Sequence, residues 1–306
     1  MEDLGSEVGL LGSRSKSSKI PLIILFLSFI LLIICFIFLI LIFNKVKKDN
    51  SETNEKTQSN MTILFVIAMK EEFNHLLSKF KDIPESRLGE YTFYKTESNG
   101  KTIYILYSGI GMVNIAISLT KFLNKIKPDI IINAGTSGGH DKSLNVGDVV
   151  LAKEAININS LETQFKGINE GSDSLTWKLT TFTEEAEEKD FAGDYEINYG
   201  DKKLISKIKD IGINLGITIY EGRVASCDIW NKEIDRINFF NKNYSTLCEE
   251  MEIFCVYTIS KQENIPSIGI KIISNNEINQ QKYDASVCEK LDEFLYKIIL
   301  DLWNNF

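Results

Sequence analysis

Long apolar runs alternate with amphipathic segments along most of the chain. Residues 62–68 form a continuous apolar run, which is typical of a strand that is covered on both faces. The segment 112–126 has helical periodicity, and Pro128 precedes a second apolar run at 129–133. This alternation predicts a mainly parallel sheet that carries ligand-binding groups on the loops at its strand ends.

The same criteria predict the remaining elements of residues 61–306. Further strands are expected at 91–94, 102–107, 149–152, 217–225 and 267–273, and helices at 70–80, 202–211, 232–240 and 253–263. The clearest helix is the last one, which repeats apolar side chains at three- and four-residue steps: Val287, Leu291, Phe294, Leu295, Ile298 and Leu302. The expected fold class is a single three-layer α/β/α domain with a central mixed, largely parallel sheet.

Residues 160–200 interrupt this pattern. They are polar, acidic around 184–190 and short of apolar periodicity. We therefore expect a long surface insertion that is mobile and lies near the functional site.

The N-terminal part predicts a membrane anchor instead of a globular core. Residues 20–43 are 24 consecutive positions without a charge, and a helix of that length spans about 36 Å, enough for the ~30 Å hydrocarbon core of a bilayer. A secretory signal has a shorter apolar region of about 7–15 residues and a small-residue cleavage site, which is not evident here. We therefore expect a polar tail (1–19), a single transmembrane helix (20–43) and a flexible stalk (44–60).

Charge and composition exclude several kinds of protein. Basic residues flank the apolar span on both sides, so the side of the membrane that the domain faces stays open. The net charge of −8 gives no reason to expect a nucleic acid partner. Two histidines, His75 and His140, are too few for a histidine-rich metal centre, and we expect neither histidine catalysis, nor a metal, nor a cofactor.

Four loops after apolar runs carry unusual residues. In 68–72 two adjacent carboxylates, Glu71 and Glu72, could simply favour a helix N-terminus. The loop 108–111 (SGIG) resembles the start of a dinucleotide-binding fingerprint, but Asn114 stands where that fingerprint has its third glycine. We therefore interpret the loop as a glycine turn that brings backbone amides close to an anionic or hydroxyl-rich ligand.

The other two loops are similarly open to two readings. Residues 133–139 (NAGTSGG) contain three glycines, which a tight turn or a close approach to a ligand would both require. Residues 248–252 (CEEME) place three acids before a helix, where they could be a solvated helix start or part of a site.

Together these loops belong to an ordered set of six motifs. In chain order they are AMKEE (68–72), SGIG (108–111), NAGTSGG (133–139), VGDVV (146–150), EME (250–252) and IPSIGIKIISN (265–275). The set resembles the nucleoside phosphorylase/nucleosidase superfamily, and most closely its methylthioadenosine/S-adenosylhomocysteine nucleosidase branch. The resemblance implies cleavage of the N-glycosidic bond of a purine nucleoside, a place in purine or methionine salvage, and a homodimer or higher homo-oligomer.

The resemblance also implies roles for individual residues. Glu72 matches the carboxylate that activates the attacking water, and Glu252 matches the residue that binds the ribose hydroxyls, with Met251 beneath the sugar. Trp230 falls where the family places an aromatic ring against the base, although packing in the core would also explain a tryptophan. The remaining substrate-binding positions are Thr136, Gly138 and Ser274.

Two positions depart from the nucleosidase pattern. Asn275 stands where the branch has the aspartate that helps to protonate the base, and an amide cannot deliver a proton. Lys271 replaces the arginine that orients this aspartate. Three readings therefore stay open: a membrane-anchored nucleosidase, a phosphate-dependent phosphorylase, or a non-catalytic nucleoside-binding or storage protein. Hydrolysis is favoured over phosphorolysis because no arginine occurs in the glycine-rich loops.

Overall fold

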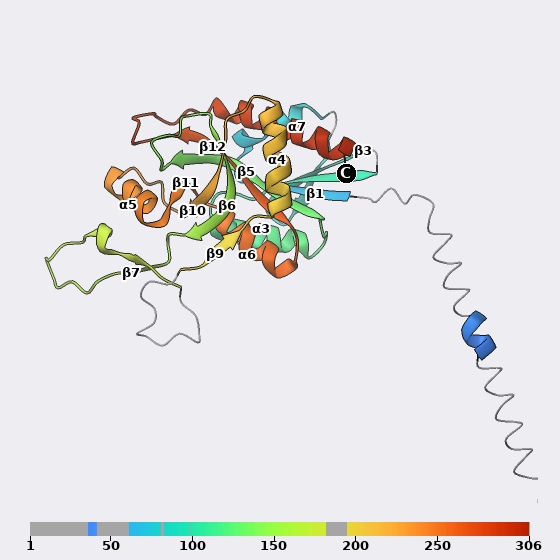
Figure 1. The fold of residues 1–306 in the computed structure, drawn as a ribbon, viewed down its shortest axis with the longest axis horizontal. Coiled ribbons are helices and arrows are strands. Elements are labelled where there is room, and N and C mark those ends of the chain that lie inside the picture. Colours follow the sequence, from blue (N-terminus) through green and yellow to red (C-terminus); the bar gives the residue numbers. More distant parts are fainter. Residues whose placement is uncertain (1–35, 42–60, 81–82, 99, 182–194, 306) are drawn as a thin grey trace, which may run out of the picture. The chain divides into compact units, whose positions relative to one another are not determined.

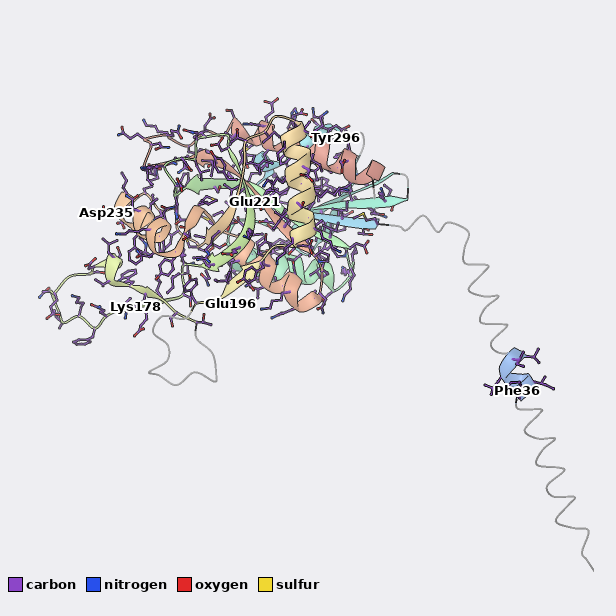
Figure 2. The ribbon with its side chains drawn as sticks, in the orientation of Figure 1. Phe36, Lys178, Glu196, Glu221, Asp235 and Tyr296 are labelled. Atoms are coloured by element: carbon purple, nitrogen blue, oxygen red, sulfur yellow. The ribbon has the colours of Figure 1, made fainter. Side chains whose placement is uncertain are left out.

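The computed structural model describes residues 36–41, 61–80, 83–98, 100–181 and 195–305. The chain divides into two units, Met1–Gln58 and Ser59–Phe306, and the second contains the α/β fold. The expected tail and stalk lie outside the described residues, as do residues 20–35 and 42–43 of the expected membrane helix. Residues 36–41 are helical, with exposed apolar side chains, and Phe36 is labelled in Figure 2. Among the helices that the structure describes, none has both the length and the apolar character needed to cross a bilayer.

A ten-stranded mixed sheet forms the centre of the second unit (Figure 1). Its strand order is β11-β10-β6-β12-β5-β1-β4-β3-β2, and β9 pairs with β6. The strands are β1 (Met61–Ile67), β2 (Glu85–Leu88), β3 (Tyr91–Ser98), β4 (Lys101–Tyr107), β5 (Ile130–Gly139), β6 (Val149–Asn157), β9 (Ile197–Tyr199), β10 (Ile219–Ser226), β11 (Thr246–Glu250) and β12 (Ser267–Asn275).

The sheet is mixed, as expected, but it is not largely parallel. Among the described strands five pairings in this sheet are parallel and five are antiparallel. The sequence pattern did not predict the edge strand β2 or the antiparallel pairing of β12 with β6. In addition, β11 pairs with β5 as well as with β10, so that β11, β10, β6, β12 and β5 close into a ring of strands.

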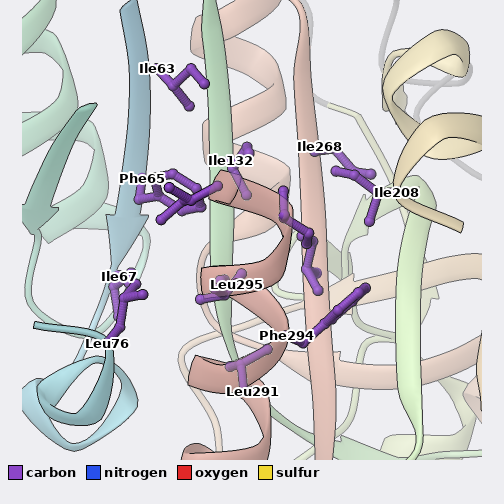
Figure 3. Packing of buried hydrophobic residues seen from close by; sticks show 14 of the residues in the cluster. Ile63, Phe65, Ile67, Leu76, Ile132, Ile208, Ile268, Leu291, Phe294 and Leu295 are labelled. Carbon is purple, nitrogen blue, oxygen red and sulfur yellow. The ribbon is translucent and has the colours of Figure 1, made fainter. Parts of the chain in front are cut away.

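Helices cover both faces of the sheet, which completes the three-layer α/β/α fold. The helices are α2 (Asn74–Ser78), α3 (Met112–Leu123), α4 (Lys202–Asn214), α5 (Ile234–Tyr244), α6 (Ile253–Glu263) and α7 (Val287–Asn305), with the 3-10 turns η1 (Lys70–Glu72) and η2 (Ser174–Thr176). One core cluster joins the sheet to α2, α4 and α7, and a second joins it to α3 and α6. Figure 3 shows Leu291, Phe294 and Leu295 of α7 packed close to the aliphatic side chains of β1, β5 and β12.

Two expected elements differ markedly in extent from those observed. The helix expected at 70–80 is split into η1 and α2, and Phe73 between them has a non-helical backbone. The strand expected at 129–133 continues to Gly139, so the glycine-rich segment is the end of β5 and not a loop. Its glycines Gly135, Gly138 and Gly139 keep negative φ and are therefore not used for a turn.

The segment 160–200 is only partly a surface insertion. Strands β7 (Leu161–Glu162) and β8 (Lys178–Leu179) form a separate small sheet, while β9 joins the main sheet through β6. Lys178 and Glu196 flank residues 182–194, which lie outside the described residues (Figure 2). Leu179 is buried against the third core cluster, which shows that this end of the segment contributes to packing.

Candidate active site

A cavity of about 270 Å³ opens where β1, β5, β11 and β12 end. The structure brings all eight sequence-predicted site residues to its wall: Glu72, Thr136, Gly138, Trp230, Met251, Glu252, Ser274 and Asn275. The described part of the segment 160–200 contributes no lining residue, so the expectation that the insertion lies at the site is wrong for that part.

Glu72 enters the cavity from the end of η1 and is only 3% exposed. One carboxylate oxygen, Oε1, accepts the backbone N–H of Thr136 (2.7 Å) and the Thr136 hydroxyl (2.9 Å), and the other accepts the N–H of Met69 (3.2 Å). Burial raises the pKa of Glu72 above its usual value despite these hydrogen bonds and the nearby Lys271. A carboxylate that is held in one place and is more basic than usual suits the role of a general base.

Glu252 reaches the cavity from the N-terminus of α6. Its Oε1 accepts the backbone N–H of Gly111 at 3.2 Å, and Gly111 adopts φ +97°, which glycine tolerates. The glycine turn at 108–111 therefore presents an amide to the protein's own carboxylate, and not directly to a ligand as the sequence suggested. Burial raises the pKa of Glu252 to about 8, and the charge of Lys271 opposes this increase.

Glu250, which also lines the cavity, and the fully buried Lys271 support Glu252. The Glu250 carboxylate accepts the backbone N–H groups of Glu252 (3.0 Å) and Ile253 (3.0 and 3.1 Å), so it caps α6. Lys271 is fully buried, with Nζ 2.6 Å from Glu250 Oε2 and 3.7 Å from Glu252 Oε2. Burial lowers the pKa of Lys271, but the two carboxylates outweigh it and raise the pKa above its usual value.

The observed contacts place Lys271 at the carboxylate end of the site. The resemblance had assigned this position to orienting the residue at 275, but the ion pairs of Lys271 are with Glu250 and Glu252. Glu250 was recognised in the sequence only as one of three neighbouring acids. Its place in the site could not be predicted from the motif, because its ion-pair partner Lys271 lies on another strand.

The glycines of β5 allow close approach of side chains from neighbouring elements. A Cβ atom at Gly135 would lie 3.0 Å from Glu72 Oε1, and one at Gly138 would lie 3.3 Å from Asn275 Nδ2. At Gly139 the distance to Asn276 Nδ2 would be 2.7 Å. The tight turn predicted for this segment is therefore wrong, and the observed close contacts are with the protein's own side chains, so close approach to a ligand stays a prediction.

Trp230 lies at the mouth of the cavity. It is 55% exposed, and its ring meets Tyr283 edge to face with centroids 5.6 Å apart. Both rings line the cavity, so Trp230 is not a core residue. Sequence reasoning did not select Tyr283, which lies in an irregular segment after β12 without a recognisable motif.

The opposite end of the cavity carries polar groups that sequence reasoning missed. Glu249 is 9% exposed, and its Oε1 accepts the backbone N–H of Asn231 at 3.2 Å. His140 Nε2 lies 3.2 Å from Glu249 Oε2, and Nδ1 lies 2.8 Å from the Thr246 hydroxyl. All of these except Thr246 line the cavity, so His140 lies in its wall.

Asn275 faces the same end from β12. Its Oδ1 lies 3.1 Å from the Ser274 hydroxyl, and its Nδ2 donates to Glu277 Oε1 at 3.4 Å. Within the part of the chain that the structure describes, no cluster of His, Cys, Asp and Glu is arranged to hold a metal ion. The cavity offers the buried carboxylates of Glu72, Glu250 and Glu252 at one end, and the Asn275 amide with the Glu249 carboxylate at the other.

Comparison with known proteins agrees with this arrangement. Residues 62–301 match the family described as the phosphorylase superfamily. The 5'-methylthioadenosine/S-adenosylhomocysteine nucleosidase of Bacillus licheniformis is 31% identical over 217 residues, which cover 70% of this chain and 86% of the relative.

Solved structures show the same fold. A mutant of the Helicobacter pylori nucleosidase with 5'-methylthioadenosine in its active site gives a TM-score of 0.65 at 20% identity, and the match covers 79% of this chain and 99% of that one. The H. pylori futalosine hydrolase gives the same TM-score at 19% identity and covers 79% and 98%. The chain therefore belongs to the nucleoside phosphorylase/nucleosidase superfamily, close to its methylthioadenosine/S-adenosylhomocysteine nucleosidase branch.

Proposed function

We propose that the protein hydrolyses the N-glycosidic bond of a purine nucleoside. The observation that carries this proposal is the presence of two buried carboxylates, Glu72 and Glu252, in one cavity, each fixed by backbone N–H groups. The Bacillus licheniformis relative named above is a nucleosidase, which supports the same reaction class.

In the proposed reaction Glu72 takes a proton from a water molecule as the water oxygen bonds to the anomeric carbon of ribose. The bond from that carbon to the base breaks, and its electron pair leaves with the base. In its ionised form, which the charge of Lys271 favours, Glu252 accepts hydrogen bonds from ribose hydroxyls and favours the cationic character that develops on the sugar. The Asn275 amide offers a hydrogen bond to the departing base, which takes its proton from solvent.

Hydrolysis is preferred over phosphorolysis because of the charges around the cavity. Phosphate sites normally use arginine or lysine, whereas none of the described residues that line this cavity is either one. The non-catalytic alternative is favoured by Asn275 alone, since this residue removes the family's proton donor.

The test is to incubate the purified full chain with methylthioadenosine, adenosine, inosine and guanosine, with and without phosphate, and to measure the free base. We expect base release without phosphate. Release that requires phosphate would identify a phosphorylase, and no release under any condition would support the non-catalytic alternative.

The matched variants are Glu72→Gln and Glu71→Gln. We expect Glu72→Gln to lower kcat by about 10²–10⁴-fold, because the general base is lost. Glu71 is the exposed neighbour of Glu72, so Glu71→Gln is expected to retain the parent rate. Equal rates for all three proteins would contradict the role of Glu72.

We further propose that the domain is held at a membrane by residues 20–43 and that it self-associates. The described part of that apolar span, residues 36–41, is helical and exposes every side chain, as a membrane helix requires. Beside the cavity, Ile110, Val113 and Ile117 form an exposed apolar stripe on and before α3, which is suited to cover by a second copy.

A further inference from the structure

At the end of the cavity that we assign to the purine base, three residues lie in a row across three neighbouring strands. Gly138 of β5 is in register with Glu249 of β11 on one side and with Asn275 of β12 on the other. Adjacent strands are about 4.8 Å apart, so the backbones at Glu249 and Asn275 are about 10 Å apart, with a residue that lacks a side chain between them. All three residues line the cavity. The gap above Gly138 is called the base slot below.

The acceptor side of the base slot is Glu249. Its Oε1 accepts the Asn231 N–H, whereas its buried Oε2 lies 3.2 Å from His140 Nε2 and has no hydrogen-bond partner among the described residues. The Thr246 hydroxyl at His140 Nδ1 and the parallel Phe240 ring hold the imidazole in turn. A carboxylate only accepts hydrogen bonds, so this side of the base slot requires a ligand that donates.

The donor side is the Asn275 amide. Ser274 lies against its oxygen and Glu277 receives one N–H, which orients the amide. Its nitrogen is the atom nearest to the position of a Cβ on Gly138, at 3.3 Å. This side of the base slot therefore presents a donor and suits a ligand atom that accepts.

These two sides distinguish the two kinds of purine. A 6-oxopurine has acceptors at O6 and N7 and donors at N1–H and, in guanine, at the 2-amino group, which matches a donor opposite an acceptor. Adenine has a donor at its 6-amino group and an acceptor at N1, so its N1 lone pair would face the carboxylate of Glu249.

We propose that Glu249 and Asn275 select a nucleoside whose base is a 6-oxopurine, such as hypoxanthine or guanine, over one that carries adenine. The inference rests on the function proposed above and names its substrate class. Glu249 is the specificity-determining residue on the acceptor side of the base slot.

The test compares kcat/KM for inosine and guanosine with that for adenosine and methylthioadenosine, using the full chain. We expect the 6-oxopurine nucleosides to be preferred by about 10-fold or more, since hydrogen bonds to charged groups differ from mismatched ones by factors of this size. A preference for either adenine nucleoside would overturn the inference and leave the hydrolase proposal intact.

The variants Glu249→Gln and Asn275→Asp test the two sides separately. In Glu249→Gln an amide N–H can donate to adenine N1, so the preference should fall by about 10-fold or more. In Asn275→Asp the carboxylate loses the donor for O6, so 6-oxopurine cleavage should fall while adenine release is retained or rises. Glu263→Gln, on the far end of α6 where Glu263 pairs with Lys127, is the control and should keep the parent preference. An unchanged preference in Glu249→Gln would overturn the inference.

Binding of free bases decides the matter even if no turnover is found. Titration calorimetry of guanine, hypoxanthine and adenine with the parent and Glu249→Gln measures the affinity of the base slot independently of the reaction. Tighter binding of a 6-oxopurine by the parent, lost in the variant, supports the inference. Equal or tighter binding of adenine, or no binding of any base, overturns it. If no nucleoside is turned over but the binding of bases is selective, the hydrolase proposal is refuted and the inference about base selection is supported.

Discussion

Two glycines of β5 lie beside different parts of the site, one beside the proposed general base Glu72 and the other beside the pocket for the purine base. A Cβ at Gly135 would press against the Glu72 carboxylate, whereas one at Gly138 would enter the base slot beside Asn275. Neither has positive φ, so an alanine is tolerated by the backbone and acts through its methyl group.

We therefore expect Gly135→Ala and Gly138→Ala to differ in steady-state kinetics. Gly135→Ala should lower kcat by about 10-fold or more with little change in KM, because a misplaced Glu72 carboxylate slows proton transfer from water. Gly138→Ala should mainly raise KM, because it narrows the slot for the base. Identical kinetic defects in the two variants would contradict this division.

A residue of the site could be predicted from the sequence only where it lies within a recognisable motif. Glu72 and Glu252 follow apolar runs within recognisable motifs. Glu249 precedes the EME motif and would read as a solvated acid. Its place beside Gly138 and His140 follows from the pairing of β11 with β5, which no local pattern encodes.

Among the elements, the connection between β12 and α6 depends on the buried ion pairs of Lys271. Replacing this lysine by methionine leaves the carboxylates of Glu250 and Glu252 without their counter-charge. We expect Lys271→Met to lower the free energy of unfolding by about 3–5 kcal/mol at pH 8. Urea denaturation measures the change, and Lys209→Met, which removes a more exposed pair with Glu221, should cost far less stability. Equal losses would contradict a structural role for the buried pair.

The contact between α7 and α2 carries a pH dependence. Buried Asp292 of α7 accepts the N–H of Leu76 at 3.0 Å, and burial raises the pKa of Asp292 to about 7. Between the usual value near 4 and about 7 the folded protein holds this proton more tightly than the unfolded chain, so stability falls as pH rises through this range.

Asp292→Asn should therefore reduce the loss of stability between pH 5 and pH 8 by about 1–4 kcal/mol. The measurement is urea denaturation at both pH values, with Glu289→Gln on the exposed face of the same helix as control. A pH dependence that is the same in parent and Asp292→Asn would exclude Asp292 as its source.

The positions of most helices and buried strands followed from periodicity, whereas their pairing did not. The helix expected at 253–263 was predicted with its observed ends, since its apolar face is regular. The extension of β5 to Gly139 was not, because glycines lower strand propensity and the contacts that favour them come from Glu72, Asn275 and Asn276.

For the whole molecule, the division at residues 58–59 predicts that the α/β unit folds alone. Deletion of residues 1–60 should give a protein that needs no detergent, melts cooperatively and retains the kcat/KM of the full chain. Thermal denaturation and nucleoside assays check this. Aggregation without a cooperative transition would place the boundary elsewhere.

The proposed self-association is tested by a charge in the exposed stripe. Val113 is 67% exposed on α3, so Val113→Glu should not disturb folding but should oppose burial against a second copy. In sedimentation experiments the truncated parent should be a homo-oligomer and its Val113→Glu variant a monomer. A parent that is itself monomeric would refute self-association through this face.

The row formed by Glu249, Gly138 and Asn275 has an evolutionary consequence. Its width is set by hydrogen-bonded strands, so it resists adjustment by loop movement, while the residues at its two ends can each be exchanged by a single substitution. Glu72, Glu252 and their supports lie at the other end of the cavity and need not change with them. A lineage with this scaffold can thus acquire a new base preference in one or two mutational steps while its sugar chemistry is inherited unaltered.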